Sequence, residues 1–229
     1  MYWDPTYILV IIAAVFSLLA SALVKSTFNR YARVSSMSGL TGAETARRLL
    51  DAAGIRDVKV EHVGGSLSDH YDPRSKTLRL SDSTYRSTSV AALGVAAHET
   101  GHAIQHDEGY LPLQIRSVLV PVASLGSRAG IPIIILGVIL SYNSLLIQIG
   151  IWVFALAVLF QLVTLPVEFN ASRRAVILLE EKGILSGGEI GQCRKVLRAA
   201  ALTYVAAAAA SVMQLLRLIL LFGGRRRDD

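Results

Sequence analysis

The stretch GVAAHETGHAIQHD, residues 94–107, contains the residues of this chain that are best suited to bind a metal ion. It contains His98-Glu99-x-x-His102, and residues four apart lie on one face of an α-helix. Two imidazoles at that spacing can hold one zinc ion at about 2.0–2.1 Å, and Glu99 can reach the open side of the ion. Zinc activates water there, and a neighbouring carboxylate can take the proton. The motif therefore predicts a metal site in which Glu99 is the general base.

The alternative is that this short motif occurs by chance on an ordinary helix. However, the surrounding helix is apolar, and burying two histidines and a glutamate in it without a partner would be costly. The small residues Ala96, Ala97, Thr100 and Gly101 also allow a second backbone or a substrate to approach closely. We therefore expect a working metal site.

A catalytic zinc ion needs a third protein ligand and one open position. His106 lies one turn beyond His102, so a straight helix cannot easily bring both to one tetrahedral ion together with His98. The longer motif HExxHxxGxxH is absent from the chain. His62 and His70 lie upstream, where strands and turns favour exposed or substrate-facing positions. None of these histidines is the preferred third ligand.

Glu168 is the preferred third ligand. It follows an apolar span directly, and a carboxylate at the bilayer surface is costly unless it has a partner such as a bound cation. The alternative is that Glu168 forms an ion pair with Arg173 or Arg174. The expected cofactor is one Zn²⁺ per chain.

The composition is that of a membrane protein. Of the 229 residues, 52% are hydrophobic and only 17% are charged. The net charge is +6, but Lys and Arg cluster beside apolar spans, which is an orientation signal and not a sign of nucleic-acid binding. The single cysteine, Cys193, allows neither an internal disulfide nor a multi-cysteine zinc site. The expected partners are the lipid bilayer and a peptide or membrane-protein substrate; oligomeric state leaves no signal in the sequence.

Four apolar runs are candidate membrane spans. Residues 7–24 carry no charge and follow a non-basic start, which favours an uncleaved anchor with its N-terminus outside. Residues 117–141, interrupted by prolines, and 145–165 form a helical hairpin whose uncharged tip lies outside. Residues 202–222 form the last run; a crossing would put the arginines at 225–227 outside, against the orientation rule, so a helix lying along the membrane is the alternative. We favour the crossing, with the active site on the cytoplasmic side of the cell membrane.

The remaining sequence predicts a small soluble part. Thr41-x-x-Glu44 is a capping box that begins a helix, and residues 58–63 and 76–81 alternate like strands. The Ser/Thr cluster at 87–89 can cap a helix that continues through the zinc motif. The fold class is therefore a mainly α membrane protein with a zincin-like HExxH helix, a small β-sheet and about four apolar membrane helices. The expected segments are an anchor (1–25), a cytoplasmic zincin-like part (26–110), a membrane hairpin (111–166), ligand-bearing and amphipathic helices (167–201), and a C-terminal membrane helix with a basic tail (202–229).

Three stretches together resemble the YugP family of membrane zinc metallopeptidases over nearly the whole chain: DHYDPRSKTLRLS, HETGHAIQH and LPVEFNASRRA. The chain is more distantly similar to the HtpX and CAAX prenyl protease group, in which a glutamate from a later helix is the third ligand. The resemblance implies that His98, His102 and Glu168 are metal ligands and that Glu99 is the base.

The chain departs from the distant group four residues after the ligand glutamate. That group has an aspartate there which can orient a ligating histidine, whereas this chain has Ser172, with Asn170 nearby. We expect Asn170 or Ser172 to form the hydrogen bond that a metal-bound histidine requires.

Two further sets of residues are candidates for contacts with a substrate. His70, Tyr71 and Arg173 are candidate donors to the oxyanion that develops during peptide hydrolysis. Residues Thr77, Leu78, Arg79 and Leu80 are a candidate strand that could offer its edge to an extended peptide; a purely structural strand in the sheet is the alternative.

The expected function is an integral membrane zinc metalloendopeptidase that cleaves membrane or misfolded proteins at the cytoplasmic face. The alternative is a non-catalytic membrane scaffold or adaptor with a structural zinc site, which would need a fourth protein ligand.

Overall fold

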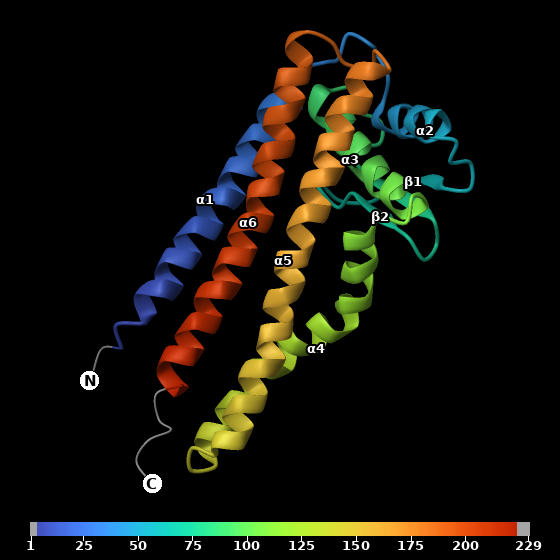
Figure 1. The fold of residues 1–229 in the computed structure, drawn as a ribbon. Helices are drawn as coiled ribbons and strands as arrows, with labels where there is room; N and C mark the ends of the chain where they lie inside the picture. Colours follow the sequence, from blue (N-terminus) through green and yellow to red (C-terminus); the bar gives the residue numbers. More distant parts are fainter. Residues whose placement is uncertain (1–3, 224–229) are drawn as a thin grey trace. The chain divides into compact units, whose positions relative to one another are not determined.

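The computed structural model describes residues 4–223, and it is mainly helical with one small sheet (Figure 1). This agrees with the fold class expected from the sequence. The expected basic tail at 225–227 lies outside the described residues. The elements are α1 (Tyr7–Tyr31), α2 (Gly42–Ala52), β1 (Lys59–Val63), β2 (His70–Asp72), β3 (Thr77–Ser81), α3 (Val90–Asp107), α4 (Leu111–Ile139), α5 (Ser144–Glu181) and α6 (Gly188–Phe222).

Both predicted helix starts in the soluble part are capped by side chains. Thr41 accepts a hydrogen bond from the Glu44 backbone while the Glu44 carboxylate accepts from the Thr41 backbone, a complete capping box for α2. The Ser89 hydroxyl accepts from the Ala92 N–H and caps α3, the helix that carries the zinc motif. The start of the motif helix is therefore fixed by a local side-chain contact.

The sheet has the strand order β1-β3-β2, with β1 parallel and β2 antiparallel to β3. Because β3 is the central strand, both of its edges are already hydrogen-bonded. The expectation that residues 77–80 offer a free edge to a peptide is therefore wrong. Strand β2, only three residues long, was not predicted, because turn residues on both sides of it hide its alternation.

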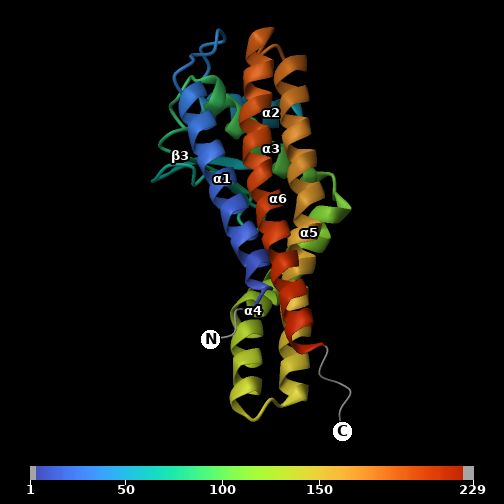
Figure 2. The same cartoon turned by 90° about the vertical axis from the view of Figure 1, so that its left-hand side faces the viewer.

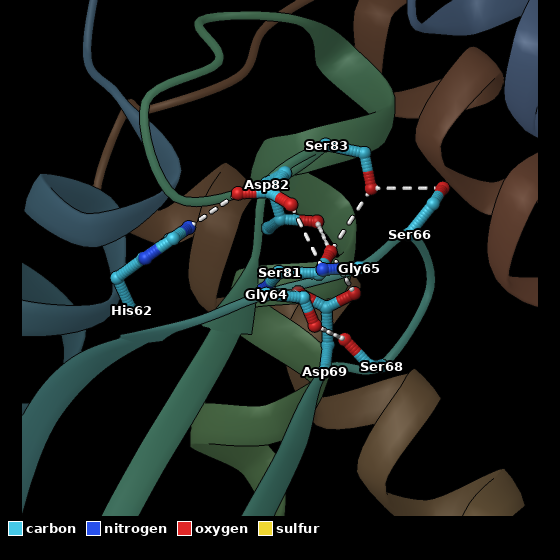
Figure 3. Close-up of polar contacts among 10 residues, drawn as sticks. His62, Gly64, Gly65, Ser66, Ser68, Asp69, Ser81, Asp82 and Ser83 are labelled. Carbon is cyan, nitrogen blue, oxygen red and sulfur yellow. Dashed lines mark hydrogen bonds and ion pairs between the residues drawn. The ribbon is translucent and has the colours of Figure 1, made fainter.

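Polar side chains close the loops at one end of the sheet (Figure 3). The Asp82 carboxylate accepts from the Gly65 N–H at 2.8 Å and contacts His62 Nε2 at 2.6 Å. The Asp69 carboxylate accepts from both the backbone and the hydroxyl of Ser81. The hydrogen bond from Gly65 and the contact with His62 lower the pKa of Asp82. These bonds hold the β1–β2 connection against the residues that follow β3.

The chain separates into two compact units. One unit comprises Ser21–Leu113 and Pro166–Leu202, and contains the sheet, α2 and α3. Its core packs α3 against α5 and α6 through residues such as Leu93, Leu179 and Leu197. This unit carries the whole of the candidate site.

The other unit comprises Met1–Ala20, Gln114–Leu165 and Thr203–Asp229. Its antiparallel legs, from α4 and α5, meet in a tight turn with Ser141 and Tyr142 at positive φ (Figure 2). Glycines let the two legs approach closely: a Cβ added at Gly126 would lie 2.5 Å from the Val153 carbonyl oxygen. The predicted helical hairpin is thus present.

The long helices are more continuous than the sequence suggested. Helix α5 passes through Pro166 without a break, so the apolar span and the stretch carrying Glu168 form one helix. Helix α6 likewise joins the amphipathic segment to the last apolar run. Among the described residues, α1, α4, α5 and α6 are long and apolar enough to cross a membrane. Helix α6 contains the C-terminal apolar run, residues 202–222. The arginines at 225–227 had argued against a membrane crossing by this run.

Candidate metal centre

Helix α3 lies close to α5 at the zinc motif because Gly101, the residue of α3 that contacts α5, has no side chain. A Cβ added at Gly101 would lie 2.9 Å from the Ala171 carbonyl oxygen, closer than real Cβ atoms come. At the other end of α3, Gly94 faces the Cys193 sulfur of α6 in the same way. The small residues of the sequence motif therefore set the distance between α3 and α5, and hence between the histidines and Glu168.

The side chains of His98, His102 and Glu168 converge, with one potential ligand atom from each within 4.8 Å of the others. Glu168 Oε2 lies 3.3 Å from His98 Nε2 and 3.6 Å from His102 Nε2. The two imidazole rings stand nearly perpendicular, at 84°, with centroids 4.8 Å apart. These are the three ligands predicted from the sequence. The prediction used the spacing of the HExxH motif, the position of Glu168 directly after an apolar span, and the resemblance to the YugP family.

These separations fit a tetrahedral zinc ion. Two donors about 2.0–2.1 Å from such an ion are ~3.3 Å apart, which is close to both nitrogen–oxygen distances. The charges fit as well, because the Glu99 and Glu168 carboxylates are both buried in this region. Burial opposes protonation of His102, yet Glu168 and Glu99 outweigh it and raise the pKa of that imidazole. The two buried carboxylates leave negative charge at this cluster that a bound cation would balance.

The outward nitrogens of both histidines contact polar side chains. The Ser172 hydroxyl lies 3.1 Å from His98 Nδ1, and Gln105 Oε1 lies 3.0 Å from His102 Nδ1. Contacts of this kind fix the ring orientation of metal-binding histidines. Ser172 is thus placed against a histidine as expected, but Gln105 was missed. Its position three residues after His102, on the same helix face, was the available signal.

Asn170 does not contact a histidine directly; it acts on Gln105. The Gln105 amide donates to the Val167 carbonyl and to Asn170 Oδ1, both at 2.9 Å. Arg174 Nε also donates to Asn170 Oδ1, at 2.8 Å. The same guanidinium forms a two-pronged ion pair with Glu108, at 2.9 and 2.7 Å, which lowers the pKa of Glu108.

The alternative pairing of Glu168 with Arg173 or Arg174 is not seen among residues 4–223. Arg174 is committed to Glu108 and Asn170. Arg173 is exposed on α5, and within residues 4–223 it is not placed against the histidines or Glu168 by any hydrogen bond or ion pair. Glu168 thus lies against the two histidines, and neither Arg173 nor Arg174 pairs with it in the described part of the chain.

The upstream candidates are bonded to groups other than His98, His102 and Glu168. The Tyr71 hydroxyl is 2.8 Å from His106 Nδ1, and burial raises the pKa of Tyr71 to about 12. His70 is exposed, with Nδ1 2.9 Å from the Ser68 carbonyl oxygen. Of the residues of β3, Thr77, Leu78 and Leu80 are buried, and Arg79 lies between the carboxylates of Glu61 and Asp72 at 3.7 and 3.5 Å. The side chains of β3 thus serve the sheet and its packing.

Fold and site together define a membrane-type helical protein with a cluster of two histidines from an HExxH helix, α3, and one glutamate from α5. The chain belongs to the family described as "Putative neutral zinc metallopeptidase", which matches residues 6–223. It is 48% identical over 201 residues to the "Putative membrane protease YugP" of Bacillus subtilis (strain 168), covering 87% of this chain and 89% of that protein. No solved structure shows significant similarity to the chain.

Proposed function

We propose that this protein is an integral membrane zinc metalloendopeptidase. The observation that carries the proposal is the convergence of His98, His102 and Glu168 at separations that suit one tetrahedral ion. These three residues would hold one Zn²⁺ per chain through two imidazole nitrogens and one carboxylate oxygen. The membership of a zinc metallopeptidase family supports the choice of metal.

Zinc bound there supplies a Lewis acid that lowers the pKa of water and polarises a peptide carbonyl. Glu99 is the proposed general base: it is buried, it follows a ligand directly, and its charge acts on His102. It would take a proton from the attacking water and deliver it to the leaving nitrogen. Two of the three candidate oxyanion donors, Tyr71 and His70, are hydrogen-bonded to other groups.

The number of protein ligands favours catalysis over a structural role. A structural zinc site is usually closed by four protein ligands, whereas a catalytic one keeps a position open. Within residues 4–223, no fourth His, Cys, Asp or Glu joins the cluster. His106, the nearest candidate in sequence, is bonded to Tyr71.

The proposed substrate is an extended segment of a membrane or misfolded protein at the cytoplasmic face. The cytoplasmic side is proposed from the distribution of Lys and Arg beside the apolar spans. Two further features support an extended substrate near the membrane. Glu168 lies on the same helix as an apolar span, so the cluster is near the membrane surface along the chain. Strand β2 is an outer strand of the sheet, and Tyr71 on it contacts α3 one turn after His102. An extended peptide could pair with the outer edge of β2.

The test is purification in detergent, metal analysis, and a cleavage assay with casein and with a membrane protein. We expect the wild type to contain about one zinc per chain and to cleave, and Glu99→Gln to keep the metal while losing at least about 100-fold in rate. Glu181→Gln, an exposed glutamate at the end of α5, is the matched control and should behave as wild type. Equal cleavage by wild type and Glu99→Gln would remove the peptidase proposal; zinc with no cleavage by either would favour the scaffold.

A further inference from the structure

A chain of hydrogen bonds leads from His102 to a guanidinium at the protein surface. It runs through the Gln105 amide on α3 and the Asn170 amide on α5 to Arg174, one turn further along α5. The Gln105 side chain is completely buried, so its orientation is set by these partners and not by water.

The chemistry of the two ends fixes the direction of every bond between them. A guanidinium only donates hydrogen bonds, so the Asn170 atom that faces Arg174 must be the carbonyl oxygen. The Gln105 atom that faces this oxygen must then be the amide nitrogen, and the Val167 carbonyl, which only accepts, requires the same. Gln105 Oε1 is therefore left to face His102.

This orientation of the Gln105 amide selects one tautomer of the neutral His102 imidazole. Gln105 Oε1 can only accept, so His102 Nδ1 must carry a hydrogen to make the 3.0 Å contact. A neutral ring with a hydrogen on Nδ1 has a lone pair on Nε2, the nitrogen that faces Glu168 at 3.6 Å. His98 lacks such a constraint, because the hydroxyl of Ser172 can either donate or accept.

We propose that Gln105, Asn170 and Arg174 are positioning residues that hold His102 in the Nδ1–H tautomer, ready to bind a metal ion through Nε2. The proposal rests on the proposed zinc site and extends it to residues outside the three candidate ligands. The ion pair of Arg174 with Glu108 holds the guanidinium in place at the outer end of the chain.

Substitutions at Asn170 distinguish an effect of hydrogen-bond direction on His102 from an effect of side-chain packing. Asn170→Asp keeps an acceptor for both Gln105 and Arg174, so zinc affinity, measured by competition with a chelator, should stay within about 3-fold of wild type. Gln105→Leu removes the direct partner of His102 and should weaken zinc binding about 10–100-fold, the usual effect of losing an outer partner of a metal-binding histidine. Asn170→Leu removes one acceptor but leaves Gln105 bonded to the Val167 carbonyl, so it should weaken zinc binding by less than Gln105→Leu. Arg174→Met should likewise weaken zinc binding by less than Gln105→Leu, whereas the control Lys182→Met, an exposed residue just after α5, should leave zinc binding unchanged.

Histidine ¹⁵N spectra of the metal-free protein in detergent give a second readout. At a pH where the ring is neutral, His102 should show Nδ1–H in wild type and Asn170→Asp, and a mixture of tautomers in Gln105→Leu. Arg174→Met and Asn170→Leu should show a smaller share of the Nε2–H tautomer than Gln105→Leu, because the Val167 carbonyl still holds the Gln105 amide. An Nε2–H signal for His102 in wild type, or equal zinc affinity in all variants, would overturn the proposal. If Asn170→Leu does not fold, Asn170→Asp and Arg174→Met decide. Failure of the wild type to bind zinc would sink the proposed function, while these spectra would still test the tautomer.

Discussion

At the scale of single residues, the site depends on a carboxylate brought from 66 residues after His102 in the chain. Glu168 is almost completely buried, with 2% of its surface exposed. Glu168→Gln keeps the shape but replaces an anionic ligand by a neutral amide. We expect zinc affinity to fall by more than the ~10–100-fold typical of an outer partner.

The measurement for Glu168→Gln is metal content after dialysis against a graded zinc buffer. Glu180→Gln serves as the control, because Glu180 lies on the same helix with an exposed side chain. Retention of wild-type zinc affinity by Glu168→Gln would show that the third ligand is another group.

Ser172 offers a smaller test at the same scale. Its hydroxyl contacts His98 Nδ1, so Ser172→Ala should weaken zinc binding about 10-fold. Ser172→Thr keeps a hydroxyl and should therefore bind zinc nearly as tightly as the wild type. Ser127→Ala is the control, because that hydroxyl bonds only the Ser124 carbonyl on an exposed helix face. A visible absorption spectrum of the Co²⁺-substituted protein would report the altered ligand orientation. An unchanged spectrum and affinity in Ser172→Ala would mean that this contact does not orient His98.

At the scale of elements, the separation of α3 and α5 is the critical quantity. Gly101→Ala would place a methyl group 2.9 Å from the Ala171 carbonyl oxygen, and backbone cannot yield as a flexible side chain would. We expect a loss of about 1–3 kcal/mol in the free energy of unfolding from overpacking. Zinc affinity should fall too, because the shift moves both histidines away from Glu168.

Gly191 is the matched control for Gly101. It lies in α6, and a Cβ added there meets nothing within 4 Å. Gly191→Ala should therefore be neutral or stabilise by up to ~1 kcal/mol through helix propensity. Thermal unfolding in detergent and zinc competition measure both variants; equal behaviour of the two would refute close packing at Gly101.

At the scale of the whole molecule, bound metal should stabilise the fold, since the unfolded chain cannot bring His98 and Glu168 together. At free zinc about 100 times the dissociation constant, the gain is ~2.7 kcal/mol. Removing the metal with a chelator should lower the melting temperature of the wild type. A variant with His98→Ala and His102→Ala should show no further decrease; an equal decrease in that variant would mean that the metal binds elsewhere.

The membrane arrangement gives a second prediction at this scale. Within one compact unit, Arg217 near the end of α6 pairs with Asp4 at 3.1 Å and lies over the Tyr7 ring at 4.2 Å. The end of α6 thus lies beside the start of α1. We expect both termini on the same side of the membrane, as tags at each end would show by protease accessibility. Termini on opposite sides would mean that α6 does not cross.

The sequence by itself determined the features that depend on local spacing. The interval between His98 and His102 places both on one helix face, and the hydroxyls of Thr41 and Ser89 define where two helices begin. The apolar runs indicated all four long helices, although prolines interrupt the run at 117–141. Such features are readable because helix periodicity and capping involve residues only a few positions apart.

The tertiary structure decided the rest. The central place of β3 depends on β2, whose three residues carry too little pattern to predict. The role of Gln105 depends on Asn170, 65 residues away, and on an arginine that fixes the direction of the bonds. Contacts of this kind follow from how helices pack, and neither composition nor periodicity encodes which distant side chain will meet a given one.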